Sequence, residues 1–537
     1  MRTVLHGDGD LMTPSLLAQR AVREPDRTCL IEAETDARIT YRALYADSVH
    51  LAERLAALGV DADSSVATML PHSIDTYRLW FGLAMLGAVE VPIGTRYRGR
   101  MLAHILEDSR ATLLIIDAAH LPELRAALRD HSGAVLRTVV VRGAAPGDGQ
   151  LEGLTVLGLA ELGGDPRGDP AEAAVPPELP AASRIALVLY TSGTTGPSKG
   201  VLVPWGQVHA TVTGAFPPGT LHADKVIYGP FPPNHVGGRL FACLGIEFGV
   251  PTVIRHVFSA SAFWTDIERY RCTTAGLVAA MAAILFNAPP REGDEGTSLE
   301  DVLMVPLIPE HREFESRFGV RVCTSFNMTE VSIPIVSGWS VEDWRSCGEV
   351  RSGPPGYQVR VVDEDDRPLG PGEVGELVCR TDRPWALNAG YHGRPQETAV
   401  AWRNGWFHTG DAFRYDDRGR FYFVDRAKDA IRRRGENVSS FEVEKELLDH
   451  EDVVLCAAIG VPSELGEEDI KAFVVTRPGS VLTEAELVAY VATKAASFMV
   501  PRYVELVDSL PVTDGTNRVK KAELRELERR RRAEASP

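Results

Sequence analysis

Short apolar runs alternate with amphipathic stretches over most of the first 325 residues of the chain. Residues 46–58 place apolar side chains at intervals of three and four and end before Gly59, a pattern that predicts a helix. The apolar runs predict strands at 65–70, 87–92, 113–116, 139–141, 185–190, 252–254 and 275–278. Such alternation is typical of parallel α/β layers, and we expect a first layer up to residue 190 and a second between 201 and 325.

The pattern changes twice in the rest of the chain. Residues 347–424 combine short strands, such as 358–362 and 376–380, with tight turns, which predicts a mainly β part. A new α+β pattern follows, with helices at 441–450 and 484–496, strands at 453–459, 470–475 and 503–507, and a charged run at 523–534 that is typical of a solvated helix. We therefore expect an N-terminal domain over 1–425 and a C-terminal domain over 426–537. Residues 143–183, rich in Gly, Pro, Ala and Asp, are predicted to form a loosely structured connection.

Length, charge and cysteine usage narrow the class of protein. A chain of 537 residues is too long for one hydrophobic core, which agrees with at least two domains. A net charge of −17 argues against nucleic acid as a main partner, because phosphate backbones are bound through an excess of Lys and Arg. The seven cysteines show no C-x-x-C spacing, so we interpret them as reduced thiols and expect no zinc site.

The start of the chain and its apolar runs bear on location. Residues 1–12 lack the apolar core of a signal peptide, and the chain holds no run of 18 apolar residues that could span a membrane. We expect a soluble, cytoplasmic protein. Its oligomeric state, including a homodimer, stays open.

One loop carries the clearest candidate chemistry. The run Thr191-Ser192-Gly193-Thr194-Thr195-Gly196-Pro197-Ser198-Lys199-Gly200 directly follows the strand predicted at 185–190. Its glycines let the backbone approach a ligand, its hydroxyls donate hydrogen bonds and Lys199 adds positive charge, a combination that suits the oxygens of a polyphosphate. It is not a Walker A loop, because Ser198 stands where G-x-x-x-x-G-K-[ST] requires its second glycine. An ordinary surface turn is the competing interpretation.

Two further runs place polar groups near a predicted strand end and a turn. Ser325-Phe326-Asn327-Met328-Thr329-Glu330 follows a strand predicted at 320–324, and ligands of α/β sheets bind at such strand ends. A single carboxylate such as Glu330 suffices for Mg²⁺, which favours one or two carboxylates plus phosphate oxygens. Gly405-Trp406-Phe407-His408-Thr409-Gly410-Asp411 ends in a carboxylate that could accept two hydrogen bonds from a ribose diol. Without the other motifs, Thr329-Glu330 would be interpreted as an ordinary helix start and Asp411 as part of an Asx-turn.

These runs, in this order, closely resemble the motifs of the adenylate-forming enzymes: acyl- and aryl-CoA synthetases, luciferases and peptide-synthetase adenylation domains. Asp425-Arg426-Ala427-Lys428-Asp429, Arg434-Gly435-Glu436-Asn437-Val438 and Phe231-Pro232-Pro233-Asn234-His235-Val236-Gly237-Gly238 also match motifs of that family. The resemblance covers roughly residues 25–525 and is greatest to acyl-CoA ligases. It implies an α/β fold with a large N-terminal domain of two α/β layers and a small β-barrel-like part, followed by a small mobile α+β C-terminal domain.

The resemblance also implies the roles of individual residues. The catalytic residues would be Thr191, Lys199, Glu330 and, at the far end, Arg518 or Lys520. The residues that hold the nucleotide and CoA would be Thr191, Ser192, Gly193, Thr194, Thr195, Gly196, Lys199, Phe326, Asn327, Thr329, Asp411, Arg426, Lys428 and Gly435. Among them, Phe326 would contact adenine, Thr329 phosphate, Asp411 the ribose, and Arg426 the ribose or a phosphate. Lys428 would be the hinge, and Gly435 would lie along the pantetheine arm. Glu330 would bind Mg²⁺. His235, Val278, Met281 and Val305 would line the acid pocket, although apolar residues of this kind are more often core. Arg432, Arg433 and Arg434 would meet CoA phosphates or form a solvated face.

Three parts of the sequence depart from the family pattern. The family's final lysine, in P-x-T-x-x-G-K-[IV], is replaced by Arg518 after one extra residue, so that either Arg518 or Lys520 would take its role. A glycine-rich loop near adenine is replaced by residues 303–309, which are larger and suggest an unusual or small acid. In the aromatic-Gly-x-Thr-Glu motif, Asn327 replaces glycine, a change we expect to be tolerated because Asn accepts a left-handed backbone.

We expect an acyl-CoA ligase that uses ATP, Mg²⁺ and CoA. As the resemblance implies, a carboxylate attacks the α-phosphate, pyrophosphate leaves, and the CoA thiol captures the acyl adenylate. Two alternatives stay open: activation of an unusual small oxyacid or transfer to a carrier-protein thiol or an amine, and a non-catalytic nucleotide-binding homologue.

Overall fold

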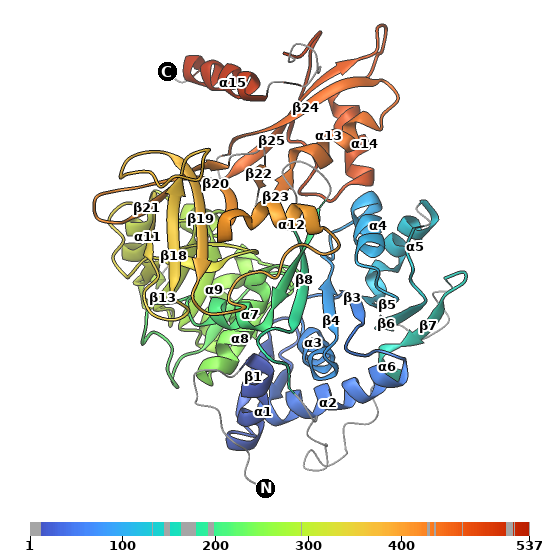
Figure 1. The fold of residues 1–537 in the computed structure, drawn as a ribbon, viewed down its shortest axis with the longest axis vertical. Coiled ribbons are helices and arrows are strands. Elements are labelled where there is room, and N and C mark those ends of the chain that lie inside the picture. Colours follow the sequence, from blue (N-terminus) through green and yellow to red (C-terminus); the bar gives the residue numbers. More distant parts are fainter. Residues whose placement is uncertain are drawn as a thin grey trace.

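The computed structural model describes residues 12–130, 133–143, 151–162, 179–191, 198–291, 293–426, 430–433, 436–463, 466–511, 519 and 521–535. Three seven-stranded sheets make up the larger part of the fold, and the elements from residue 430 onward lie together at the top of Figure 1. Within these ranges, no helix combines the length and the apolar character that crossing a membrane requires.

The first sheet holds the two strands that frame the predicted phosphate loop. Its order is β7 (Thr155–Gly158), β6 (Thr138–Arg142), β5 (Leu113–Asp117), β3 (Ser65–Met69), β4 (Val89–Pro92), β8 (Ile185–Thr191) and β9 (Lys199–Pro204). Neighbouring strands are parallel except β8 and β9, which pair antiparallel. The accompanying helices are α2 (Tyr41–Ala57), α3 (Ile74–Leu86), α4 (Gly99–Asp108), α5 (Leu121–Asp130) and α6 (Leu159–Leu162).

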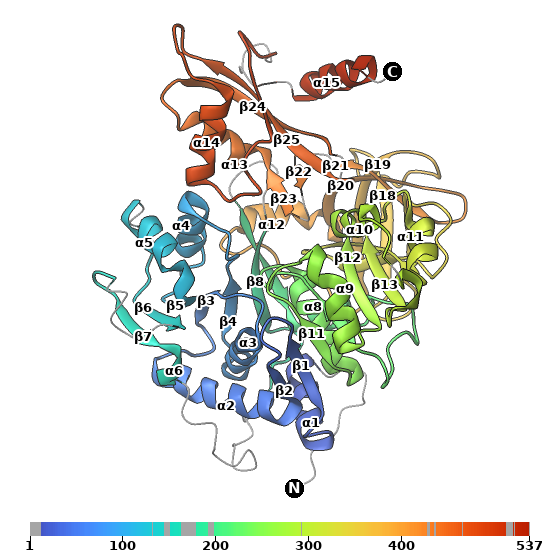
Figure 2. The same ribbon diagram turned by 180° about the vertical axis from the view of Figure 1, so that it is seen from behind.

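The second sheet combines two strands from near the start of the chain with five from residues 227–323. Its order is β14 (Arg321–Cys323), β13 (Asp301–Val305), β12 (Thr274–Val278), β10 (Ile227–Gly229), β11 (Thr252–Ile254), β1 (Thr28–Glu32) and β2 (Arg38–Thr40). All are parallel except β2. The helices of this half, several of which are seen from behind in Figure 2, are α1 (Thr13–Arg23), α7 (Trp205–Val212), α8 (Val236–Phe248), α9 (Ala260–Tyr270), α10 (Ala279–Asn287) and α11 (His311–Phe318).

The third sheet is antiparallel, in the region that was predicted to be mainly β. Its order is β15 (Ser325–Met328), β16 (Ser332–Val336), β17 (Ser346–Val350), β21 (Phe421–Arg426), β20 (Phe407–Tyr415), β19 (Gly375–Thr381) and β18 (Tyr357–Val362), with helix α12 (Pro395–Ala401) beside it. The last part of the chain adds β22 (Ala430–Arg433), β23 (Glu436–Ser439), α13 (Ser440–Leu448), β24 (Val453–Pro462), β25 (Glu468–Thr476), α14 (Glu484–Lys494), β26 (Tyr503–Leu506) and α15 (Lys521–Ala535).

The two α/β layers, the β part and the α+β pattern at the end of the chain are confirmed. The expectation of a loosely structured connection over 143–183 is wrong for the segment that contains β7 and α6. β7 is a partly exposed edge strand parallel to β6, so it lacks the apolar run by which the other strands were recognised. Strands β1 and β2, which lie between two helices near the start of the chain, were not predicted.

A buried ion pair joins the two parallel-sheet halves. Arg239 of α8 donates from Nη2 to Glu90 Oε1 of β4 at 2.7 Å, and neither side chain is more than 3% exposed. Thr68 Oγ1 also donates to Glu90, at 2.6 Å, and the guanidinium lies 4.8 Å from the centroid of the Trp80 ring. The two charges are therefore paired inside the protein, while Glu90 Oε2 and Arg239 Nη1 are buried without a hydrogen-bond partner.

We predict that Glu90→Gln costs about 3–5 kcal/mol, because it leaves the Arg239 charge buried without a counterion. Scanning calorimetry should show the first unfolding transition at a clearly lower temperature. The matched control is Asp365→Asn, which breaks an exposed ion pair with Arg367 (3.3 Å) and should change little. Equal shifts in the two variants would contradict the prediction.

Candidate active site

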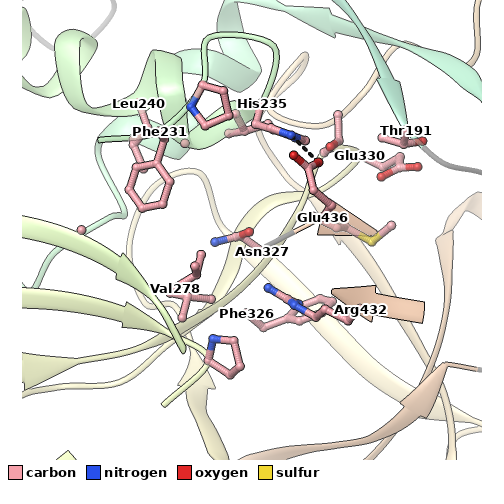
Figure 3. A pocket seen from close by; sticks show the side chains of 18 of the residues that line it. Thr191, Phe231, His235, Leu240, Val278, Phe326, Asn327, Glu330, Arg432 and Glu436 are labelled. Atoms are coloured by element: carbon pink, nitrogen blue, oxygen red, sulfur yellow. Dashed lines mark ion pairs between the residues drawn. The ribbon is translucent and has the colours of Figure 1, made fainter. Parts of the chain in front are cut away.

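A cavity of about 1660 Å³ lies where the parallel sheets, the antiparallel sheet and the C-terminal elements meet. Every predicted site residue whose side chain the structure describes lines it: Thr191, Lys199, His235, Val278, Met281, Val305, Phe326, Asn327, Thr329, Glu330 and Asp411. Figure 3 shows its polar and apolar sides, with Thr191, Glu330 and Glu436 on one and Phe231, Leu240 and Val278 on the other. Motifs that are far apart in sequence therefore meet in one place.

Some predicted site residues cannot be placed. Outside the described residues lie Ser192, Gly193, Thr194, Thr195, Gly196, Lys428, Gly435, Arg518 and Lys520, and also Arg434. The backbone of Arg426 is described, and its strand register pairs it with Asp411. Roles for these residues stay predictions.

The ends of the predicted phosphate loop are held by strand pairing. Thr191, the last residue of β8, lies opposite Lys199, the first residue of β9. The Lys199 ammonium forms an ion pair with Glu397 of α12 and lies 5.5 Å from the centroid of the Tyr391 ring. Although burial favours the neutral acid, Lys199 and Arg394 hold the pKa of Glu397 below its ordinary value. Lys199 is thus already neutralised at the cavity wall.

A C-terminal carboxylate holds the other end of the same loop. Ser198 donates from its backbone N–H (3.0 Å) and from Oγ (3.1 Å) to Glu442 Oε1 of α13. Burial raises the pKa of Glu442, and the two hydrogen bonds from Ser198 only partly oppose that rise. No local pattern indicates this contact, because the two residues are 244 positions apart.

The Phe326–Glu330 segment comprises the end of β15 and the start of the turn that leads to β16. Phe326 packs edge-on against Phe413, with ring centroids 4.9 Å apart. Tyr391 donates to Glu330 Oε1 at 3.3 Å, and Gln207 donates to the backbone carbonyl of Thr329 at 2.6 Å. Burial and the nearby Glu330 carboxylate raise the pKa of Tyr391, so its hydroxyl stays a donor. The turn therefore fixes a buried carboxylate at the cavity wall.

The backbone of Asn327 corrects one expectation. It lies in β15 and is not among the residues with positive φ, so the left-handed conformation we expected Asn to accommodate is not adopted there. The glycine of the family motif is thus not needed here for its backbone freedom. The consequence of Asn327 lies in its side chain, which projects into the cavity (Figure 3).

A bulge in β20 aims Asp411 at the cavity. Ala412 pairs with Glu376 and His408 with Val378, so residues 409–411 stand opposite a single residue of β19. Gly410 has φ of +72°, a left-handed conformation that favours glycine. The Glu376 carboxylate accepts the Gly410 N–H at 2.9 Å. The Thr-Gly-Asp sequence thus makes a rigid bulge that presents a carboxylate.

His235 takes part in a charge cluster with the C-terminal hairpin. Its Nε2 lies 2.8 Å from Glu436 Oε2 of β23, and Arg96 also donates to that carboxylate. Burial alone would lower the pKa of His235, but Glu436 outweighs it and raises that pKa above the ordinary value. Burial opposes the charge of Glu436 as well, yet His235 and Arg96 keep its pKa below the usual range. Glu436 belongs to the motif at residues 434–438, whose local pattern does not indicate His235 as its partner.

The opposite end of the cavity is apolar. Val278 and Val305 are paired neighbours on β12 and β13, and Met281 follows in α10. Phe231 stacks on Phe241 with ring centroids 5.4 Å apart. A Cβ at Gly276 would lie 2.1 Å from the Phe241 ring, so this wall requires glycine. These side chains can bind the hydrocarbon part of a ligand.

Arg432 and Arg433, two residues of the basic run, lie in different environments. Arg432 lines the cavity, whereas Arg433 is buried and donates to the carbonyls of Phe498 and Val500. Arg433 therefore serves the C-terminal fold and is not part of a surface that meets CoA phosphates.

The donor set of the cavity fits a magnesium nucleotide. Among the described residues, no group of three or more His, Cys, Asp or Glu side chains could hold a metal ion by itself. Glu330 is a buried carboxylate at the cavity wall, and Mg²⁺ commonly uses one such ligand together with phosphate oxygens and water. The ion would thus come with the nucleotide.

Comparisons with known proteins agree with this geometry. The chain matches the family model described as AMP-binding enzyme over residues 17–392 and the AMP-binding enzyme C-terminal domain over 442–515. It is 31% identical to a sulfoacetate–CoA ligase of Cupriavidus necator (93% of this chain, 94% of the relative). It is 30% identical to a crotonobetaine/carnitine–CoA ligase of Salmonella heidelberg (90% and 93%).

Solved structures share the fold. An o-succinylbenzoate CoA synthetase of Bacillus subtilis superposes with a TM-score of 0.79 at 23% identity, covering 96% of this chain and 98% of that one. The amide bond synthetase McbA of Marinactinospora thermotolerans gives a TM-score of 0.80 at 23% identity, covering 96% and 99%. The resemblance seen in the motifs is therefore confirmed over the length of the molecule, and the chain belongs to the AMP-binding enzyme family of adenylate-forming enzymes.

Proposed function

We propose that the protein is an AMP-forming ligase that activates a carboxylic acid with ATP and transfers the acyl group to the thiol of CoA. One observation carries the proposal: separate motif residues line a single cavity that is charged and polar at one end and apolar at the other. Relatives that match over most of the chain are named CoA ligases, which supports CoA as the acceptor. The protein's contribution would be positioning and charge neutralisation.

The polar end is assigned to the nucleotide. Phe326 would contact adenine, the Asp411 carboxylate would accept from the ribose hydroxyls, and Glu330 would bind the magnesium ion. Mg²⁺ would supply neutralisation of phosphate charge. Thr191 and the loop that follows it would donate to phosphate oxygens, with Thr329 beside them.

Lys199 would exchange partners when the nucleotide binds. In the present structure its charge is neutralised by Glu397, which also binds Arg394 (3.3 Å). A phosphate of the nucleotide would compete with the Glu397 carboxylate for Lys199. After Lys199 leaves, Glu397 would still have Arg394 as a cation. The exchange therefore need not leave the Glu397 carboxylate without a cation.

The acid is assigned to the region between His235 and the apolar wall. Its carboxylate would lie near His235, which the present structure holds on Glu436, and its hydrocarbon part would contact Val278, Met281 and Val305. One wall of the cavity is formed by the ends of β3, β11, β12 and β13. Among its described residues, this wall has the histidines His72 and His256 and no Asp, Glu, Lys or Arg side chain.

We further propose two domains, 1–425 and 426–537, that rotate about Lys428 between the half-reactions. In the present arrangement the C-terminal residues Glu436 and Glu442 contact His235 and Ser198. This arrangement would serve thioester formation, with Gly435 along the pantetheine arm. Adenylation would need a second arrangement that brings Arg518 or Lys520 to the reacting carboxylate.

We predict that Glu330→Gln lowers the rate of ATP–pyrophosphate exchange about 10²–10³-fold, because a positioned charge at the phosphates is lost. The variant should also need more Mg²⁺ for half-maximal rate. The assay uses a broad panel of carboxylic acids. Glu313→Gln, at an exposed position of α11, is the matched control and should exchange normally. Background exchange by the wild type with every acid would favour a non-catalytic homologue.

We predict that one of Arg518→Ala and Lys520→Ala slows pyrophosphate exchange about 10²–10³-fold, while the other has little effect. Neither should slow thioester formation from preformed acyl adenylate and CoA. Arg529→Ala, on the exposed side of α15, is the control. Normal exchange in both variants would show that neither residue replaces the family lysine. Adenylate without a CoA thioester would direct the search to carrier-protein thiols and amines.

We predict that docking of residues 430–439 weakens as pH rises through the pKa of His235. Because that pKa is raised in the folded protein, the contribution of the protonated His235 is complete below the ordinary value of about 6.5 and is lost above the raised one. Hydrogen–deuterium exchange, corrected for intrinsic rates, should show protection of these residues falling with pH. Glu436→Gln should remove the dependence, and His222→Gln, an exposed histidine, should not. A pH-independent wild type would contradict this assignment.

A further inference from the structure

Two polar side chains of β15 face the cavity without a protein partner. Asn327 is exposed to the cavity, and its amide makes no hydrogen bond with any described residue. Ser325 also lines the cavity, is 3% exposed, and its Oγ is buried with no partner. A buried hydroxyl without a partner is unfavourable, and a ligand group or water would relieve it. Both positions are thus open to a ligand.

Ser325 and Asn327 lie two residues apart on one wall of the cavity, which Phe326 between them also lines. The pairing of β15 with β16 is irregular between Phe326 and Met328, so the regular alternation of side chains does not hold at Asn327. The Phe326 ring packs edge-on against Phe413. We call Ser325 and Asn327 the polar strip.

The position of the strip indicates which part of the acid it would meet. Figure 3 shows Asn327 between the apolar side chains Phe231 and Val278 and the His235–Glu436 pair. It thus lies where the proposed function puts the carbons next to the reacting carboxylate. An amide and a hydroxyl are neutral, and each can both donate and accept a hydrogen bond.

The charged side chains beside the strip are already paired. Figure 3 shows Arg432 and the His235–Glu436 pair near Asn327, and Arg432 lies 3.8 Å from Glu467. The wall on the other side is made of Val278, Leu303 and Val305. His72, which also lines the cavity, is neutral at physiological pH because burial lowers its pKa to about 3. A sulfonate or a quaternary ammonium at this point would have to take a counterion from one of these pairs, whereas a hydroxyl or keto group would match the amide.

We propose that Asn327, supported by Ser325, is a specificity-determining residue that selects acids with a neutral hydrogen-bonding substituent, a hydroxyl or a keto group, close to the carboxylate. The inference rests on the proposed function and names its substrate class. In an acid without the substituent, the Asn327 amide would lose its water on binding and gain no partner.

The test compares matched acids in ATP–pyrophosphate exchange. Butanoate, 2-hydroxybutanoate, 3-hydroxybutanoate and 3-oxobutanoate differ only in the group that Asn327 would contact. We expect kcat/KM to be about tenfold higher for the best substituted acid than for butanoate, the size of one hydrogen bond. Asn327→Gly, which restores the family glycine, should reduce this ratio to near one, and Asn327→Ser should restore part of it.

The ratio separates recognition from folding. A loss of stability lowers the rates with both acids alike, so it leaves the ratio unchanged. Asn404→Gly is the matched control, because Asn404 lies outside the cavity and already has φ of +54°, which glycine accepts. Ser325→Ala should lower the ratio by a smaller factor than Asn327→Gly.

Each outcome decides between the alternatives. Equal or faster exchange with butanoate, an unchanged ratio in Asn327→Gly, or a clear preference for sulfoacetate or crotonobetaine, which have no hydroxyl or keto group, would overturn the inference and leave the ligase proposal standing. Background exchange with every acid, across chain lengths and aromatic acids, would contradict the proposed function, and this inference would fall with it.

Discussion

Parallel strands leave their carboxyl ends at one edge of a sheet, and the site depends on this constraint. Residues that line the cavity follow β3, β4, β10 and β11 or end β8, β12 and β13. The two parallel sheets thus contribute one edge each, while the antiparallel sheet closes the space with the turn after β15 and the bulge of β20. The buried ion pair between Arg239 and Glu90 connects the two halves.

The charges of the cavity are already paired in this structure. Lys199 is neutralised by Glu397, His235 and Arg96 by Glu436, and Ser198 donates to Glu442. A substrate group that binds Lys199 or His235 must therefore displace the carboxylate that pairs with it in this structure. Because Glu436 and Glu442 come from the C-terminal part, replacement at the cavity and movement of that part would be thermodynamically coupled.

Local patterns predicted most of the fold, and the reason is visible in the elements themselves. Buried parallel strands such as β5 and β8 are continuous apolar runs, so they can be recognised without a partner. β7 is a half-exposed edge strand, so it has no continuous apolar run. β1 pairs in parallel with β11, which comes much later in the chain. Pairing between distant segments leaves no local signal.

The same distinction applies to the site. Thr191, Glu330 and Asp411 belong to contiguous motifs, which carried enough information to predict that they would line one cavity. The partners Glu397, Glu436 and Glu442 are single carboxylates whose roles come from tertiary contacts. For Asn327 the motif gave the position but a wrong physical reason, since side-chain direction depends on the strand register.

The register of β1 has a consequence for synthesis. Leu30 pairs with Thr252, so this strand finds no parallel neighbour until β11 has left the ribosome. At 5–20 residues per second, the edge of β1 that pairs with β11 stays unpaired for roughly 10–40 s. During that interval, an apolar strand edge is open to association with other chains.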